Sequence, residues 1–87
     1  MDNKLNLKIA RLHRLEGDGL MKAFVDIVVN DSLLLRGLRV IEGKKGLFVS
    51  MPKEQGKDKR WYDTIRPVTK EAQEEIANVV LKAYKDE

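Results

Sequence analysis

Apolar and polar residues alternate along much of the first half of the chain, and this pattern constrains the fold more than any other feature. Three long runs alternate in this way or are rich in β-branched side chains, at residues 4–14, 20–29 and 33–41, and a shorter run covers residues 47–51. Because successive side chains of a strand point to opposite faces of a sheet, these runs predict four β-strands with at least one buried face.

Short polar segments separate the runs and indicate tight turns between antiparallel neighbours. Residues 16–19 read Glu-Gly-Asp-Gly, Asn30-Asp31 follows the second run, and residues 42–46 read Glu-Gly-Lys-Lys-Gly. Residues of these types tolerate the positive φ angles that tight turns require. Pro52 has no N–H to donate to a neighbouring strand, so the fourth strand is predicted to end there.

The apolar period becomes helical near the end of the chain. Thr69 is a favourable N-cap, and the apolar residues after it share one helix face: Ala72, Ile76, Val79, Val80 and Ala83. We therefore expect a helix over about residues 69–84. The predicted fold class is α+β, a small antiparallel β-sheet of about four strands with a C-terminal α-helix packed on it.

The length of the chain favours one domain spanning residues 1–87. With 87 residues, of which 43% are hydrophobic, the chain can bury one small core. Strands at the edges of such a sheet can pair with another chain, and a small core benefits from association. We therefore expect a homodimer.

Several protein classes are disfavoured by what the sequence lacks. There is no cysteine, and no apolar run approaches the length of about 18 residues that a membrane span needs. The first residues also lack the apolar segment of a signal peptide. These features predict a cytoplasmic protein that has no disulfides and does not associate with membranes.

Residues suited to catalysis do not form a recognisable constellation. His13 is the only histidine, and residues 43–46 lack the spacing and the hydroxyl residue of a Walker loop. A small enzyme is therefore the least supported interpretation. The sequence predicts no catalytic residue, cofactor, metal or small-molecule substrate.

Positive charge is concentrated in the front of the chain. Residues 1–66 carry 14 Lys and Arg against nine Asp and Glu, whereas residues 67–87 carry three against five. The two parts therefore carry +5 and −2, and their sum is the net charge of +3. This asymmetry is compatible with an anionic partner that contacts the first part of the chain.

Residues 53–60, KEQGKDKR, are densely charged and are predicted to form a basic loop, because no periodic pattern runs through residues 53–66. Their cations immediately precede Trp61 and Tyr62. Cations beside aromatic rings are typical of nucleic-acid-binding surfaces, because the cations neutralise phosphates and the rings stack on bases. The alternative is a solvated loop after which Trp61 packs on the core. Residue type alone favours packing for Trp61 and is neutral for Tyr62.

Two arginines flank Gly37 in the third predicted strand. Strict alternation places Arg36 and Arg39 on opposite faces of the sheet, so that one of them lies among apolar neighbours. A carboxylate such as Asp26 or Asp63 could satisfy that arginine structurally.

Four segments resemble, in order and spacing, the stage V sporulation protein G family of septation regulators. They are GLMKA at 19–23, LRVIEG at 38–43, GLFVSMP at 46–52 and YDTIRPV at 62–68. The combination of RVIEG with GLFVSMP is the most specific part. The resemblance extends over about residues 5–84.

This resemblance implies a bacterial cytoplasmic protein that binds DNA and also RNA, regulates gene expression rather than catalysing a reaction, and forms a homodimer built on the β-sheet. It also implies that residues 53–59 influence which nucleic-acid sequence is preferred. This chain has Gly56-Lys57-Asp58 where the family commonly has Pro-Asp-Gly, so a more flexible loop is expected. Arg66 stands where many relatives carry histidine.

The predicted nucleic-acid contacts lie within and just after the charged segment. They are Lys53, Gln55, Lys57, Lys59, Arg60, Tyr62 and Arg66. The chief alternative is a protein-interaction module, in which a face or an edge of the sheet docks a partner without direct nucleic-acid binding.

Overall fold

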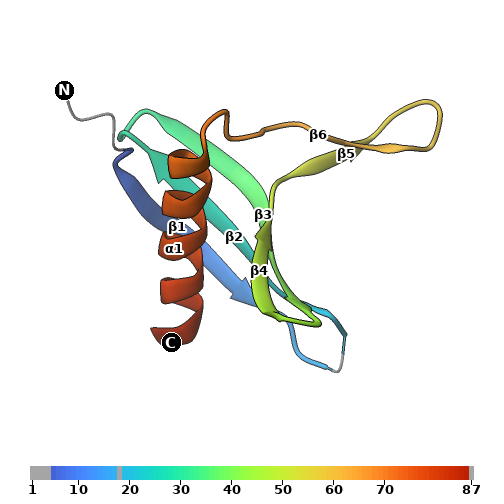
Figure 1. Ribbon diagram of the computed structural model, residues 1–87, viewed down its shortest axis with the longest axis horizontal. Coiled ribbons are helices and arrows are strands. Elements are labelled where there is room, and N and C mark those ends of the chain that lie inside the picture. Colours follow the sequence, from blue (N-terminus) through green and yellow to red (C-terminus); the bar gives the residue numbers. More distant parts are fainter. Residues whose placement is uncertain (1–4, 18, 87) are drawn as a thin grey trace.

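The computed structural model describes residues 5–17 and 19–86. Its main body is an antiparallel sheet with the strand order β1-β2-β3-β4 (Figure 1). The strands are β1 (Leu7–Arg14), β2 (Met21–Val29), β3 (Leu33–Gly43) and β4 (Gly46–Ser50). The predicted α+β class and four-stranded sheet are confirmed. Residue 4, where the first strand was expected to begin, and Asp18 of the first turn lie outside the described residues.

One helix, α1 (Lys70–Asp86), covers one face of this sheet (Figure 1). The helix begins directly after the predicted N-cap, Thr69. The Thr69 hydroxyl accepts a hydrogen bond from the Ala72 N–H at 3.1 Å. We call the sheet face under α1 the inner face and the opposite face the outer face. The buried core lies between α1 and the inner face and consists of Ala23, Val25, Ile27, Val29, Leu38, Val40, Ile76 and Val80.

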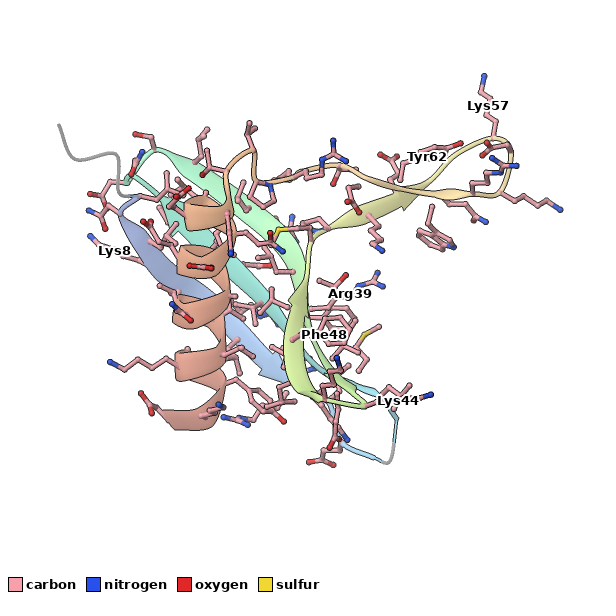
Figure 2. The ribbon with its side chains drawn as sticks, in the orientation of Figure 1. Lys8, Arg39, Lys44, Phe48, Lys57 and Tyr62 are labelled. Atoms are coloured by element: carbon pink, nitrogen blue, oxygen red, sulfur yellow. The ribbon has the colours of Figure 1, made fainter. Side chains whose placement is uncertain are left out.

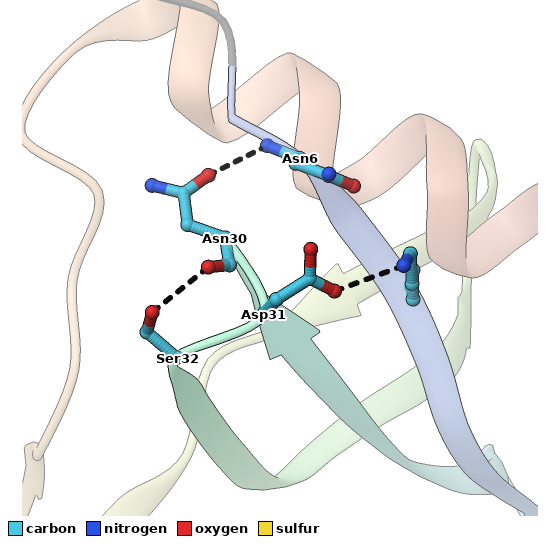
Figure 3. A network of polar contacts seen from close by, with 5 residues as sticks. Asn6, Asn30, Asp31 and Ser32 are labelled. Carbon is cyan, nitrogen blue, oxygen red and sulfur yellow. Dashed lines mark hydrogen bonds and ion pairs between the residues drawn. The ribbon is translucent and has the colours of Figure 1, made fainter.

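The turn between β2 and β3 is the predicted tight hairpin. Asn30 and Asp31 both have a φ of 52°. Figure 3 shows how their side chains are used: Asn30 Oδ1 accepts the Asn6 N–H at 2.8 Å, and Asp31 Oδ1 pairs with Lys8 Nζ at 2.9 Å. The Ser32 hydroxyl donates to the Asn30 carbonyl at 2.9 Å. The turn therefore also ties the start of β1 to the hairpin.

A β-bulge in β3 changes which side chains reach the outer face. Val25 pairs with Leu38 but Ile27 pairs with Leu35, so Arg36 and Gly37 together oppose Asp26. Gly37 has a φ of 88°, a conformation that favours glycine.

The extra residue of this bulge shifts the alternation by one, so Arg36 and Arg39 both lie on the outer face. The prediction that they point to opposite faces is therefore wrong. Asp26, one of the two suggested partners, does approach an arginine, with Oδ2 4.0 Å from Arg36 Nε. Asp63 instead lies 4.0 Å from Lys53.

Residues 53–60, which were predicted to be a basic loop, form a β-hairpin together with residues 61–63. β5 (Lys53–Gln55) pairs with β6 (Trp61–Asp63) as a separate two-stranded sheet that projects from the main body (Figure 1). We call residues 53–63 the arm. Strands of three residues are too short to show a period of two, which is why the pattern missed them. Pro52 is buried, and its carbonyl accepts the Thr64 N–H at 3.0 Å, which closes the base of the arm.

Candidate nucleic-acid interface

The tip of the arm is a tight turn held by two backbone hydrogen bonds. The Lys59 N–H donates to the Gly56 carbonyl at 3.0 Å, and the Gly56 N–H donates to the Arg60 carbonyl at 2.8 Å. Lys59 has a φ of 66°, in the left-handed region. A turn followed by one left-handed residue is a common way to close a short hairpin, although glycine more often occupies that position.

Asp58 is engaged inside the arm. It accepts hydrogen bonds from the Tyr62 hydroxyl at 2.5 Å and from the Arg60 N–H at 3.0 Å. These bonds, the one from Tyr62 foremost, lower the pKa of Asp58, and the carboxylate in turn raises the pKa of Tyr62. Much of the hydrogen-bonding capacity of the Asp58 carboxylate is thus used within the hairpin.

The Tyr62 ring lies against Gly56, and this contact explains the glycine. A Cβ at residue 56 would stand 2.9 Å from Tyr62 Cε2 and 3.1 Å from Asp58 Oδ1. Gly56 therefore permits a close approach of backbone and ring, so that the hydroxyl reaches Asp58. This arrangement holds the ring of Tyr62 in place although the residue is 51% exposed.

The predicted contact residues come together on the arm and at its base. Lys57 lies at the tip and Tyr62 on the second strand (Figure 2). Gln55 donates to the Lys59 carbonyl at 3.1 Å, and is thus engaged in the turn as well. Arg66 lies beyond the arm and lines, with Trp61 and Tyr62, a hollow of about 520 Å³. Lys53 at the base is near Asp63.

Three cations of the arm are left for an external anion. Lys57, Lys59 and Arg60 are exposed and have no ion pair with an acidic residue among those the structure describes. The expectation that Trp61 packs on the core is wrong, because the arm carries it away from the main sheet and its side chain is 59% exposed. Trp61 and Tyr62 are consecutive in β6 and therefore face opposite sides of the arm.

Sequence reasoning missed a second group of exposed residues, on the outer face. Phe24 and Arg39 are direct neighbours in the pairing of β2 with β3, and Phe48 lies on β4. The Arg39 guanidinium is 5.8 Å from the centre of the Phe24 ring. Gly37 was the available signal, because a glycine inside a strand pattern often marks a bulge.

Residues 5–17 and 19–86 contain no group of three or more His, Asp or Glu side chains placed to hold a metal ion. None of the helical structure described is long and apolar enough for a membrane span.

The chain belongs to the SpoVG family, whose model matches residues 5–86. It is 39% identical over 77 residues to a protein of Archaeoglobus fulgidus named "Putative septation protein SpoVG", covering 88% of this chain and 91% of that relative. Relatives of the same name occur in Symbiobacterium thermophilum, with 45% identity over 85% of this chain, and in Staphylococcus aureus strain JH9, with 39% identity over 85%. The match covers 53% of the Symbiobacterium protein and 74% of the Staphylococcus protein. The resemblance inferred from the four short segments is confirmed, and these names refer to septation rather than to an enzymatic activity.

Proposed function

We propose that this protein is a nucleic-acid-binding regulator of the SpoVG type, which acts in the cytoplasm and contacts DNA, and also RNA, with its arm. The observation that carries the proposal is the projecting hairpin, on which Lys57, Lys59 and Arg60 have no acidic partner among the described residues while Trp61 and Tyr62 are exposed. Phosphates attract such cations, and bases stack on such rings.

The shape of the arm supports the same proposal. A two-stranded β-ribbon fits the major groove of duplex DNA, and the arm is such a ribbon standing clear of the main body (Figure 1). Its turn and its Asp58–Tyr62 hydrogen bond define its conformation before binding. A preformed ribbon loses less conformational entropy on binding than a disordered loop.

We also propose that two copies act together as a homodimer built on the sheet. β4 lies at an edge of the main sheet, with a strand neighbour on one side only in the part of the chain that the structure describes. Such an edge can pair with the same strand of a second copy. Two arms on one particle raise the affinity for a site with two contact points through effective concentration.

The test is a salt series with duplex DNA and the variant Lys57→Gln/Lys59→Gln/Arg60→Gln. If each cation neutralises one phosphate, the slope of log K against log salt should fall by about 2.7 per arm, at about 0.9 for each contact. The matched control is Lys70→Gln/Lys82→Gln/Lys85→Gln on α1, which removes the same charge from exposed positions elsewhere.

The control should keep the wild-type slope, apart from a small general effect of net charge. Equal slopes for the wild type and the arm variant would overturn the proposal and favour the protein-interaction module. Replacement of residues 53–59 by those of the Staphylococcus relative, followed by selection from random DNA and RNA pools, then asks whether the arm also selects sequence.

A further inference from the structure

The outer face of the main sheet has aromatic and cationic side chains but no covering element in the described chain. α1 packs on the inner face, whereas Phe24 and Phe48 on the outer face are 36% and 48% exposed. Figure 2 shows Arg39 and Phe48 on the side away from α1, toward which the arm projects. Phe24 on β2 and Phe48 on β4 lie on either side of β3, so the two rings flank one strand of this face.

The pairing of the strands places Arg39 between the two rings. Arg39 is opposite Phe24 on β2 and opposite Ser50 on β4. Phe48 is opposite Ile41, the next residue of β3 on the same face. Arg39 forms no ion pair with a described acidic residue, and its Nε is buried with no hydrogen-bond partner among those residues. Its charge is thus uncompensated, beside a ring that favours a cation.

Two further arginines and one aspartate lie on this face among the described residues. The register between β1 and β2 shifts after Ile9, so that Arg11 is opposite Asp26. Asp26 accepts the Gly37 N–H at 3.1 Å and lies 4.0 Å from Arg36. These residues, with His13 and Phe24, line a shallow hollow of about 410 Å³. The outer face is therefore net positive.

This distribution favours a nucleic acid over a second copy of the chain. A symmetric dimer that packed outer face on outer face would bring two net positive surfaces together, and like charges disfavour such packing. Phosphates are complementary to the arginines, and bases are complementary to the rings. A helix-backed antiparallel sheet with exposed aromatic residues is also a known architecture for holding unpaired bases.

We propose that the outer face binds unpaired bases of a single-stranded DNA or RNA segment, which stack on Phe24 and Phe48 while Arg11, Arg36 and Arg39 contact its phosphates. This inference rests on the proposed function and assigns a second substrate class to it. The arm contacts the backbone and the groove of a duplex, and the outer face contacts unpaired nucleotides. One molecule would then recognise a duplex that adjoins a single strand.

The experiment compares Phe24→Leu/Phe48→Leu with the arm variant Lys57→Gln/Lys59→Gln/Arg60→Gln. The probes are labelled dT12, rU12 and a duplex of random sequence, and the measurement is fluorescence anisotropy. Leucine keeps the face apolar but removes the rings, so affinity for dT12 and rU12 should fall about tenfold for each ring, with duplex affinity changed less than twofold. The arm variant should chiefly lose duplex affinity.

The matched control is Leu34→Ala, an exposed apolar residue of the outer face that has no ring. It should bind dT12 as the wild type does. Melting temperatures confirm that each variant is folded, and sedimentation reports its oligomeric state. A second measurement uses 5-iodouracil in place of one base, and the expected photo-crosslink lies on the peptide that contains Phe24 or Phe48.

The possible failures are distinguishable. Wild type that binds duplex but neither single strand would overturn this inference and leave the proposed function standing. Wild type that binds none of the probes would overturn both. If the phenylalanine variant dissociates a dimer, or binds single strands as well as wild type does, the face is not a stacking site and the inference fails.

Discussion

The main body and the arm are ordered by different interactions. The body encloses a cluster of buried apolar side chains between the sheet and α1. Every residue of β5 and β6 is exposed, so the arm depends on its backbone ladder, its turn and the Asp58–Tyr62 hydrogen bond. Because little apolar surface is buried there, changes in the arm should alter binding more than stability, whereas changes in the body should do the reverse.

The largest expected effect is on the free energy of unfolding when a core residue of the main body is changed. Ile76→Ala should lower the free energy of unfolding by about 2–4 kcal/mol, because it removes buried methyl groups from the contact between α1 and the sheet. Trp61→Ala removes a larger side chain from the arm and should cost less than about 0.5 kcal/mol, as other exposed substitutions do. Urea unfolding of both variants is the measurement. Comparable losses would mean that the arm is part of the folding core.

A smaller effect is expected at the bulge that shapes the outer face. Gly37→Ala forces a Cβ into a backbone with a φ of 88° and should cost about 1–2 kcal/mol. Gly19→Ala is the control, because Gly19 is exposed and a Cβ there would meet nothing within 4 Å. Thermal unfolding measures both. If Gly37→Ala leaves the unfolding temperature unchanged, the backbone at the bulge accommodates a Cβ and the position does not require glycine.

The smallest effect on global stability is expected within the arm. Tyr62→Phe removes the hydrogen bond to Asp58, so the pKa of Asp58 should rise toward its ordinary value of 3.8. Because the folded pKa of Asp58 is lowered, the ionised carboxylate stabilises the folded arm above pH 3.8. This stabilisation is lost as the pH falls through the folded pKa. The folded pKa of Tyr62 is raised, so the protonated hydroxyl stabilises the folded arm below pH 10.0. This stabilisation is lost as the pH rises through the folded pKa.

NMR titration of the Asp58 carboxyl carbon and hydrogen exchange of the Arg60 amide measure this change directly. We expect faster exchange at Arg60 in Tyr62→Phe at neutral pH, with the unfolding midpoint of the body unchanged. An unaltered Asp58 titration would contradict the structural role assigned to the Tyr62 hydroxyl.

Much of the body could be predicted from the sequence because its signals are local. The β2–β3 turn at Asn30 and Asp31 and the cap at Thr69 depend on residues close together in the chain. The strands and α1 were recognisable from their apolar periods, since each buries one face. The cations proposed for the interface were also visible in the sequence, as a cluster after Pro52.

The sequence by itself determined the order of β1 to β4, their turns and α1, because periodicity and turn chemistry act over a few residues. Only the tertiary structure decided that Arg36 and Arg39 share the outer face, since a bulge is defined by the pairing of β3 with β2. It also decided that Trp61 is exposed. Whether an aromatic ring is buried depends on where its strand is directed, and β5 and β6 pair with each other away from the core.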